Sequence, residues 1–225
     1  MNTEKIYQGN CIEVLKDFPA ESIDCVVTSP PYWGLRDYGT AEWEGGDDNC
    51  EHKGKVERTA APGSSIQAVN KGANFVSSGD CECGAIRKDS QLGLEETPEE
   101  FVDNLVKVFS EVKRVLKKEG TVWLNLGDSY IGGGRGYDYC KDGTVQMNHI
   151  KAGVKYGKPT GKIKGLKSKD LTGIPWRVAF ALQSDGWYLR QDIIWHKPNP
   201  MPESVQDRCT KSHEYIFLLT KSAKY

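Results

Sequence analysis

The chain has 225 residues, of which 38% are hydrophobic and 27% charged, and this length suits one sizeable core with an insertion. The formal net charge of -1 excludes a uniformly basic nucleic-acid-binding protein. Neither an apolar leader nor an apolar run near about eighteen residues is present, so the sequence argues against secretion and membrane spanning and predicts a cytoplasmic protein. The seven cysteines favour free thiols or a metal site over a disulfide framework.

The first elements read as strand, helix, strand. Residues 5–10 are expected to form a short strand, and Ile12, Leu15 and Phe18 recur at helical spacing behind it. The apolar, partly β-branched run at residues 23–27 then predicts a second strand. Its cysteine, Cys25, is expected to be a small core residue.

Residues 42–92 are rich in Gly, Asn, Ser and Cys and lose periodicity, so we expect an inserted loop or subdomain there. The clearest helix follows in "TPEEFVDNLVKVFSEVKRVLKKEG". Thr97 can cap it, Pro98 suits its first position, Glu100 completes a capping box, and Gly120 is the expected terminator.

The sequence "TVWLNLGDSY" predicts a buried strand that runs into a glycine-rich loop. Because the loop lacks the G-x-G-x-x-G pattern, we expect it to be flexible rather than phosphate-binding. "IPWRVAFALQSDG" predicts a helix, and "WYLRQDIIWHK" and "HEYIFLLTK" predict two more strands. Repeated helix–strand order is typical of a doubly wound α/β sheet, and the whole chain, residues 1–225, is interpreted as one domain carrying the insert.

The chemistry is concentrated in Ser29-Pro30-Pro31-Tyr32, directly after the strand at residues 23–27. The simplest interpretation is a strand that ends in a rigid turn. In an open α/β sheet, however, the carboxyl ends of strands face the ligand crevice. There the Ser29 hydroxyl and the Pro30 carbonyl offer two acceptors on a stiff backbone, and Tyr32 offers a ring face. This arrangement suits a planar heterocycle that carries an exocyclic amino group.

The stretch "TSPPY" closely resembles the fourth motif of the DNA amino-methyltransferases, which methylate N4 of cytosine or N6 of adenine. Outside the insert and the lysine-rich segment, nearly the whole chain is similar to the permuted class of these enzymes, in which the catalytic half precedes the cofactor half. The resemblance implies a Rossmann-like fold, S-adenosylmethionine as cofactor, double-stranded DNA as partner and a role in restriction-modification or phage protection.

The resemblance also implies residue roles. Ser29 and the Pro30 carbonyl would hold the amino group, Pro31 would rigidify the turn, and Tyr32 would stack on a base flipped out of the duplex. Gly9 and Asn10 occupy the positions at which the family shows Gly-Asp and binds the adenine of the cofactor. Asparagine can still accept a hydrogen bond there but carries no charge.

Serine at the first motif position favours cytosine N4 over adenine N6. Three alternatives stay open: an N6-adenine enzyme, a non-catalytic DNA-binding fragment, and a methyltransferase of RNA or of protein glutamine. Enzymes that methylate amide nitrogens use a related N-P-P-Y turn. Ser29 stands here in place of its asparagine, which counts against a glutamine methyltransferase. The F-x-G-x-G cofactor motif, which follows the catalytic half in this class, is not found in the sequence. We therefore expect a fold incomplete at its C-terminus. The chain is either a fragment or split gene product that needs a complementing chain, or a catalytic half that binds S-adenosylmethionine poorly.

Two further clusters carry predictions. Cys50 and His52, with Cys81 and Cys83 about thirty residues on, could close a tetrahedral structural Zn²⁺ site in the insert, or they could be unligated loop residues. The resembled enzymes often carry a Cys/His-rich insert at this place.

"WHKPNPMPES" resembles a family motif beside the flipped-base pocket. Trp195 and Lys197 are therefore predicted to contact base or backbone, with a core position as the alternative for Trp195. Residues 151–169 contain seven lysines and no acidic residue, so this segment is predicted either to track DNA phosphates or to be a solvated loop.

Overall fold

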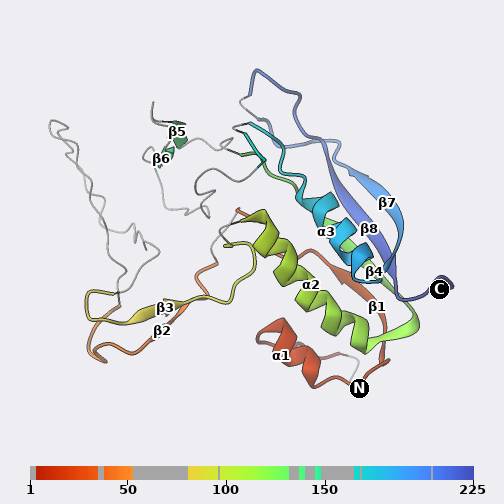
Figure 1. Cartoon of the computed structure of the whole chain (residues 1–225), viewed down its shortest axis with the longest axis horizontal. Helices are drawn as coiled ribbons and strands as arrows, with labels where there is room; N and C mark the ends of the chain where they lie inside the picture. Colours follow the sequence, from red (N-terminus) through yellow and green to blue (C-terminus); the bar gives the residue numbers. More distant parts are fainter. Residues whose placement is uncertain are drawn as a thin grey trace.

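Figure 1 shows the computed structural model of the chain. It describes residues 4–34, 38–52, 81–95, 97–131, 165–167, 169–203 and 205–225, together with the backbones of two short strands, β5 (Tyr137–Tyr139) and β6 (Val145–Met147), which form an antiparallel pair.

The main element is a four-stranded sheet in the order β1-β4-β8-β7. The strands span Ile23–Thr28 (β1), Leu116–Leu126 (β4), Tyr188–His196 (β7) and His213–Thr220 (β8). β1 pairs parallel to β4, whereas β8 runs antiparallel to both β4 and β7. The carboxyl ends of β1, β4 and β7 and the amino end of β8 therefore meet at one edge of the sheet.

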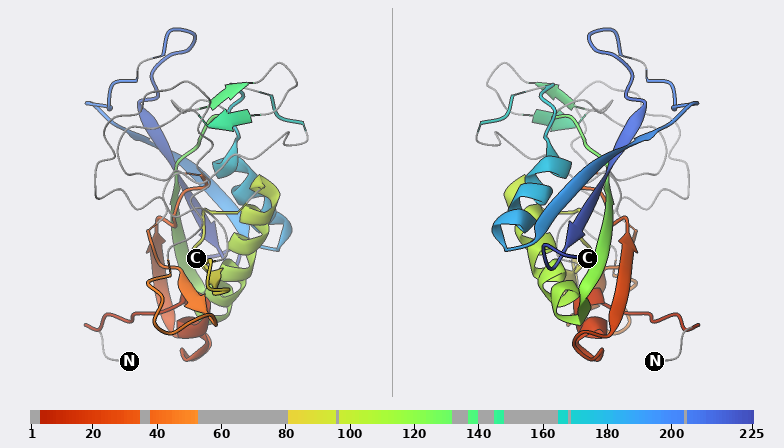
Figure 2. Two further views of the ribbon diagram at one scale, coloured as in Figure 1. Left: turned by 90° about the vertical axis from the view of Figure 1, so that its left-hand side faces the viewer. Right: turned by 90° about the vertical axis from the view of Figure 1, so that its right-hand side faces the viewer.

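Three helices accompany the sheet: α1 (Cys11–Lys16), α2 (Pro98–Val115) and α3 (Ile174–Ser184). α2 packs between α1 and α3, and the two longer helices cover one face of the sheet (Figure 2). The core lies between these helices and the strands, and its largest fully buried side chains include Phe101, Phe109, Leu124, Leu182 and Phe217. Among the described residues no helix covers the opposite face.

The start of α2 confirms its predicted capping. Thr97 is the N-cap and its side chain accepts from the Glu100 amide, while Pro98 occupies the first turn. The predicted end was wrong, because the helix stops at Val115 and not before Gly120. Leu116 already belongs to β4, pairs with Ile23 and is fully buried. Core burial at Leu116 therefore overrides the helical preference of the lysines that follow.

The predicted strand at residues 5–10 is absent. The described residues in this range are exposed and have no regular secondary structure, and Ile6 is 94% exposed. A strand gains its stability from a paired neighbour, and no described strand pairs with this segment.

The prediction for Cys25 was also wrong, because its side chain is exposed. Strand residues alternate between faces, and Cys25 and Val27 point to the face that no described helix covers. Val27 is 79% exposed although it belongs to the apolar run at residues 23–27. Hydrophobicity alone does not show which face of a strand is covered.

In the insert, β2 (Glu42–Glu44) pairs antiparallel with β3 (Ile86–Lys88). The beginning and the end of the insert therefore lie side by side. Residues 53–80 lie outside the described residues. None of the described helices combines the length and apolarity needed to cross a membrane.

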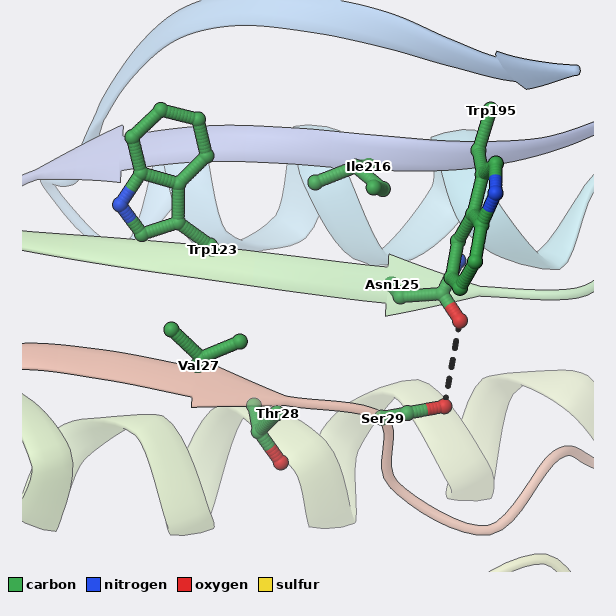
Figure 3. Close-up of a pocket in the computed structure, with 7 residues that line it drawn as sticks. All are labelled: Val27, Thr28, Ser29, Trp123, Asn125, Trp195 and Ile216. Carbon is green, nitrogen blue, oxygen red and sulfur yellow. Dashed lines mark hydrogen bonds between the residues drawn. The ribbon is translucent and has the colours of Figure 1, made fainter.

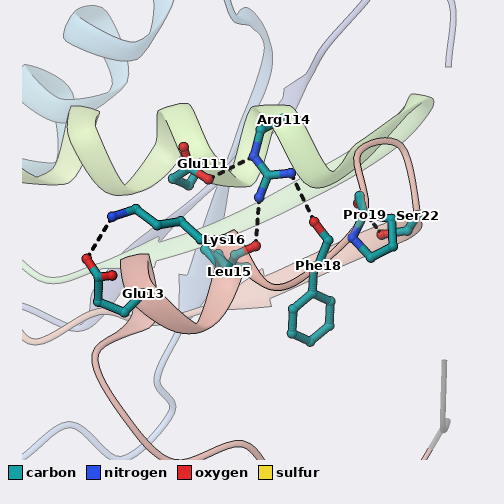
Figure 4. Close-up of polar contacts among 8 residues, drawn as sticks. All are labelled: Glu13, Leu15, Lys16, Phe18, Pro19, Ser22, Glu111 and Arg114. Atoms are coloured by element: carbon teal, nitrogen blue, oxygen red, sulfur yellow. Dashed lines mark hydrogen bonds and ion pairs between the residues drawn. The ribbon is translucent and has the colours of Figure 1, made fainter.

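Arg114 ties α1 to the end of α2 (Figure 4). Its guanidinium donates to the carbonyl oxygens of Leu15 and Phe18, at 2.7 and 2.9 Å, and pairs with Glu111 at 2.9 Å. The last carbonyls of a helix lack partners within the helix, and the Leu15 carbonyl here accepts from Arg114 in addition to the Phe18 amide at 3.0 Å. One side chain thus fixes the short helix, which has no fully buried residue of its own.

We expect Arg114→Ala to lower the free energy of unfolding by about 1–3 kcal/mol, because it removes charge-assisted hydrogen bonds to two carbonyls. Urea denaturation followed by circular dichroism measures the change. Lys16→Ala is the control, since the Lys16–Glu13 pair is exposed and its loss should change the free energy of unfolding very little. Equal effects of the two substitutions would contradict the bridging role of Arg114.

Candidate active site at the carboxyl edge of the sheet

The predicted catalytic residues lie at the edge where the strands converge. Ser29 follows β1 directly, and the Pro-Pro turn then carries Tyr32 across to β4. The Ser29 hydroxyl donates to Asn125 Oδ1 at 3.2 Å, and the Tyr32 hydroxyl lies 2.8 Å from the same oxygen. Asn125 Nδ2 donates to the Tyr215 carbonyl, which fixes the amide with its oxygen toward Ser29. The lone pairs of the Ser29 oxygen thus remain available as acceptors.

Two glycines make room for Tyr32. A Cβ at Gly127, just after β4, would lie 2.4 Å from Cε2 of the Tyr32 ring, and a Cβ at Gly93 would lie 2.8 Å from the Tyr32 carbonyl oxygen. Neither separation is compatible with a real side chain. The ring therefore occupies the space that a side chain at position 127 would need.

Glu214, at the start of β8, completes the polar group. Its Oε2 accepts from the Tyr32 hydroxyl at 3.0 Å, and its Oε1 pairs with the Lys197 ammonium. Partial burial raises the pKa of Glu214, but hydrogen bonds from Lys197 and Tyr32 and the charge of Lys197 outweigh it, so the pKa is lowered. Burial raises the pKa of Tyr32. At neutral pH a carboxylate therefore faces a protonated phenol.

A hollow of about 430 Å³ lies on the uncovered face beside this group (Figure 3). Its lining is mainly apolar and consists of Val27, Thr28, Ser29, Trp123, Asn125, Trp195 and Ile216. Trp195, from β7, is 51% exposed and extends toward Asn125, so it is not the core residue of the alternative interpretation. Lys197 is paired with Glu214, and its ammonium keeps further donors, so the predicted contact to DNA stays a prediction.

The start of the glycine-rich loop, which the sequence predicts to be flexible, is tied to α3 by hydrogen bonds. The Asp128 carboxylate accepts from the backbone amides of Gly173 and Ile174, at 3.1 Å each, and from the Thr172 hydroxyl at 2.6 Å. A carboxylate at the first turn of α3 is favourable because it meets unpaired amides and the positive end of the helix dipole. It also anchors the end of β4 next to Asn125. Residues 132–136 lie outside the described residues.

Gly9 and Asn10 lie at the start of α1. Asn10 is its N-cap, and Asn10 Oδ1 accepts from the Ile12 amide at 3.0 Å. Gly9 has a φ of 148°, and a Cβ there would approach Val14 Cγ2 to 3.1 Å. A carbonyl oxygen can accept two hydrogen bonds, so capping is compatible with the predicted contact to the cofactor, which stays a prediction.

The four predicted metal ligands come together in the insert. Their ligand atoms all lie within 4.8 Å of one another, with Cys50 Sγ 3.6 Å from Cys81 Sγ and Cys83 Sγ 3.3 Å from His52 Nδ1. Hydrogen bonds from the backbone of Asp47 and Ala85 lower the pKa of Cys83 to about 6. The set therefore contains a thiol that readily becomes the thiolate that metals bind.

Of the predicted lysine segment, residues 151–164 and 168 lie outside the described residues. Lys169 is described and pairs with Asp207. Asn125, Gly127 and Glu214 are site residues that the sequence did not suggest. A polar residue inside the apolar run "VWLNL" was the available signal for Asn125; Glu214 had only its place at the start of a predicted strand.

Comparison with known proteins agrees with this geometry. The family model described as DNA methylase, for N6 and N4 methyltransferases, matches residues 23–225. The chain is 42% identical over 226 residues to Type II methyltransferase M.Cfr9I of Citrobacter freundii, a match that covers all of this chain and 57% of that protein. It is 44% identical over 221 residues to Type II methyltransferase M.SmaI of Serratia marcescens, covering 98% of this chain and 57% of that protein.

The chain therefore spans a little over half the length of these relatives. Among solved structures, PvuII DNA methyltransferase (cytosine-N4-specific) aligns with a TM-score of 0.50 at 18% identity, covering 97% of this chain and 49% of that chain, which supports the fold. The family match, the mixed α/β sheet and the Ser-Pro-Pro-Tyr turn at its carboxyl edge agree, and the chain belongs to the DNA methylase family of N6 and N4 amino-methyltransferases.

Proposed function

We propose that this chain is the catalytic portion of a DNA methyltransferase of a type II restriction-modification system. It would transfer a methyl group from S-adenosylmethionine to the exocyclic amino group of a flipped base, with cytosine N4 as the target. The observation that carries the proposal is the convergence of Ser29, Tyr32 and Asn125 at the carboxyl edge of the sheet, beside an apolar hollow.

The Ser29 oxygen would hold the target amino group. An exocyclic amino nitrogen is a poor nucleophile because its lone pair is delocalised into the ring. Since the Ser29 hydrogen is directed to Asn125 Oδ1, the serine lone pairs can accept one amino hydrogen, and the Pro30 carbonyl can accept the other. Both contacts favour a more tetrahedral nitrogen whose lone pair is free to attack. The acceptors are positioned before the substrate arrives, which is the main contribution of such a site to rate.

Two aromatic side chains of the site would hold the flipped base. Tyr32 is fixed by Glu214 and Asn125 and seated against Gly127, and Trp195 contributes a half-exposed ring to the lining of the hollow. A flipped base loses its stacking in the duplex at a cost of a few kcal/mol, and aromatic contacts of about 1–3 kcal/mol per base offset that cost. When bound, S-adenosylmethionine supplies the electrophilic methyl group, and Gly9 and Asn10 are the proposed contacts to its adenine.

Cytosine N4 is preferred over adenine N6 because the first motif residue is Ser29. Its hydroxyl carries no charge, and within the resembled family serine at this position favours cytosine. Adenine N6 is the second candidate, since the same acceptors suit either amino group.

A complementing polypeptide segment is part of the proposal. β1 forms one edge of the described sheet, and the face without described helices carries Val27, Trp123, Trp195 and Ile216 around the hollow. A strand pairing with β1 and helices packing on this face would cover Val27 and Trp123 and would leave Ser29, Asn125 and Trp195, at the carboxyl ends of the strands, accessible to the base. The relatives contain enough additional chain for such a segment.

The proposal is tested by nucleoside mass spectrometry of methylation-free DNA incubated with the chain and isotopically labelled S-adenosylmethionine. The assay is run on the chain alone and on the chain mixed with the separately expressed remainder of M.SmaI. Label in N4-methylcytosine is the expected result, and label in N6-methyladenine alone would overturn the choice of base. No label in either mixture, with the chain folded and the DNA bound, would favour the non-catalytic DNA-binding fragment.

A further inference from the structure

The cluster of Cys50, His52, Cys81 and Cys83 lies beside the β2–β3 ribbon of the insert. Cys50 and His52 follow β2, and Cys81 and Cys83 precede β3. Two tight turns present them: the Cys50 amide donates to the Asp47 carbonyl at 2.9 Å, and the Cys81 amide donates to the Ala85 carbonyl at 2.8 Å. The four ligands thus come as two pairs on facing turns.

The distances fit a tetrahedral Zn²⁺ site. Zinc–sulfur bonds of about 2.3 Å and zinc–nitrogen bonds of about 2.0–2.1 Å place ligand atoms roughly 3.5–3.8 Å apart. Two of the pairs lie at 3.6 and 3.3 Å, and all four ligand atoms lie within 4.8 Å of one another, so small side-chain shifts bring the set to these separations. A disulfide between Cys50 and Cys81 would need a sulfur–sulfur distance of about 2.05 Å and would leave Cys83 and His52 unused. Three thiols and one imidazole are a zinc donor set.

The segment after the cluster contacts the catalytic turn directly. The Gly34 amide donates to the Gly93 carbonyl at 2.9 Å, and the Trp33 indole donates to the Glu95 carbonyl at 3.0 Å. The Glu95 carboxylate accepts from the Gly93 amide and from Asn104 of α2. Residues 91–95 therefore bridge the turn that carries Tyr32 and the helix behind it.

The strands next to the cluster are short. Its strand β3 has three residues and pairs only with β2, itself three residues long, among the described strands. A two-stranded ribbon of this size is not stable alone in water. A metal that joins both ends of the ribbon would add a strong constraint by linking positions 50–52 to positions 81–83, about thirty residues further along the chain.

We propose that Cys50, His52, Cys81 and Cys83 bind one structural Zn²⁺ that holds residues 85–95 against the catalytic turn. The metal would take no part in methyl transfer. Its effect on the active site would be to keep Trp33 and Gly34, and with them Tyr32, in place.

The first measurement is metal content by inductively coupled plasma mass spectrometry, on chain purified under reducing conditions without chelator. One zinc per chain is expected. Cys81→Ser and Cys83→Ser should each lose the metal, whereas Cys209→Ser should retain it, because Cys209 is exposed and outside the cluster. Absence of zinc, or an intact mass two daltons lower with Cys50 and Cys81 linked, would overturn the proposal.

The second measurement tests the coupling and needs neither variants nor activity. Hydrogen exchange of the wild-type chain is compared before and after removal of zinc by a chelator. The Gly34 amide should exchange at least tenfold faster without zinc, while amides at the centre of β4 should not change. Zinc present in the protein with no change at Gly34 would overturn the link to the catalytic turn. Since no methylation is measured, this result does not depend on the proposed function.

Discussion

Replacing Ser29 with alanine is expected to lower kcat for DNA methylation by at least about 100-fold, with a much smaller change in KM for DNA, since a positioned polar group at the reacting atom contributes about 10²–10³. The substitution removes the oxygen that accepts the amino hydrogen and leaves the Pro-Pro turn intact. Steady-state kinetics with labelled S-adenosylmethionine, in whichever form of the enzyme methylates DNA, measure the change.

Ser184→Ala is the matched control. Ser184 is an exposed serine at the end of α3 whose hydroxyl donates to the Phe180 carbonyl. It should leave both constants within a factor of two. If Ser29→Ala retained more than about a tenth of the wild-type kcat, Ser29 would not be the acceptor that the chemistry requires.

Phe217→Ala is expected to lower the free energy of unfolding by about 3–5 kcal/mol, more than the other substitutions proposed here, because it opens a cavity in the core. Phe217 is fully buried in β8, between Leu124 of β4 and Asp192 of β7, and its ring lies 5.1 Å from Trp176. Domains of this size are stable by only about 5–15 kcal/mol, so the variant is measured by urea denaturation at low temperature.

Phe180→Ala is the control, because Phe180 also contacts Trp176, at 5.6 Å, but is 53% exposed. Its loss should cost no more than about 1.5 kcal/mol, the usual value of an aromatic pair. Phe217→Leu, which refills part of the cavity, should fall between the two. If Phe217→Ala lowered the free energy of unfolding no more than Phe180→Ala does, Phe217 would not be part of the core.

The sequence predicted most of the regular elements because their signals are local. Thr97 and Pro98 mark the start of α2, and Pro175 and Gly186 bracket α3. The strands β1, β7 and β8 were found as short apolar or β-branched runs between turn residues. These features act within a few residues of the chain, so a single sequence suffices to read them.

The predictions were wrong where the local structure depends on parts of the molecule that are distant in sequence. Whether residues 5–10 form a strand depends on a neighbouring strand, and whether Val27 and Cys25 are buried depends on which face of the sheet is covered. The end of α2 was missed because Leu116 is drawn into the sheet by its pairing with Ile23.

The site was predicted only where its residues are neighbours in sequence. Ser29 to Tyr32 form one motif in sequence and could be found together, and the four metal ligands fall into two recognisable pairs. Glu214 lies 182 positions from Tyr32 and meets it only because β8 returns to the end of β4. Pairings of that kind are set by topology, which one sequence does not display.

The contact between Gly127 and Tyr32 has a genetic consequence. Every glycine codon begins with two guanines, and any change of amino acid at position 127 adds a Cβ within van der Waals overlap of the Tyr32 ring. Single-base changes that keep the protein translated therefore divide sharply, into synonymous ones and ones that displace the ring. The codon offers no conservative replacement, so a position without a side chain is among the least substitutable in the active site.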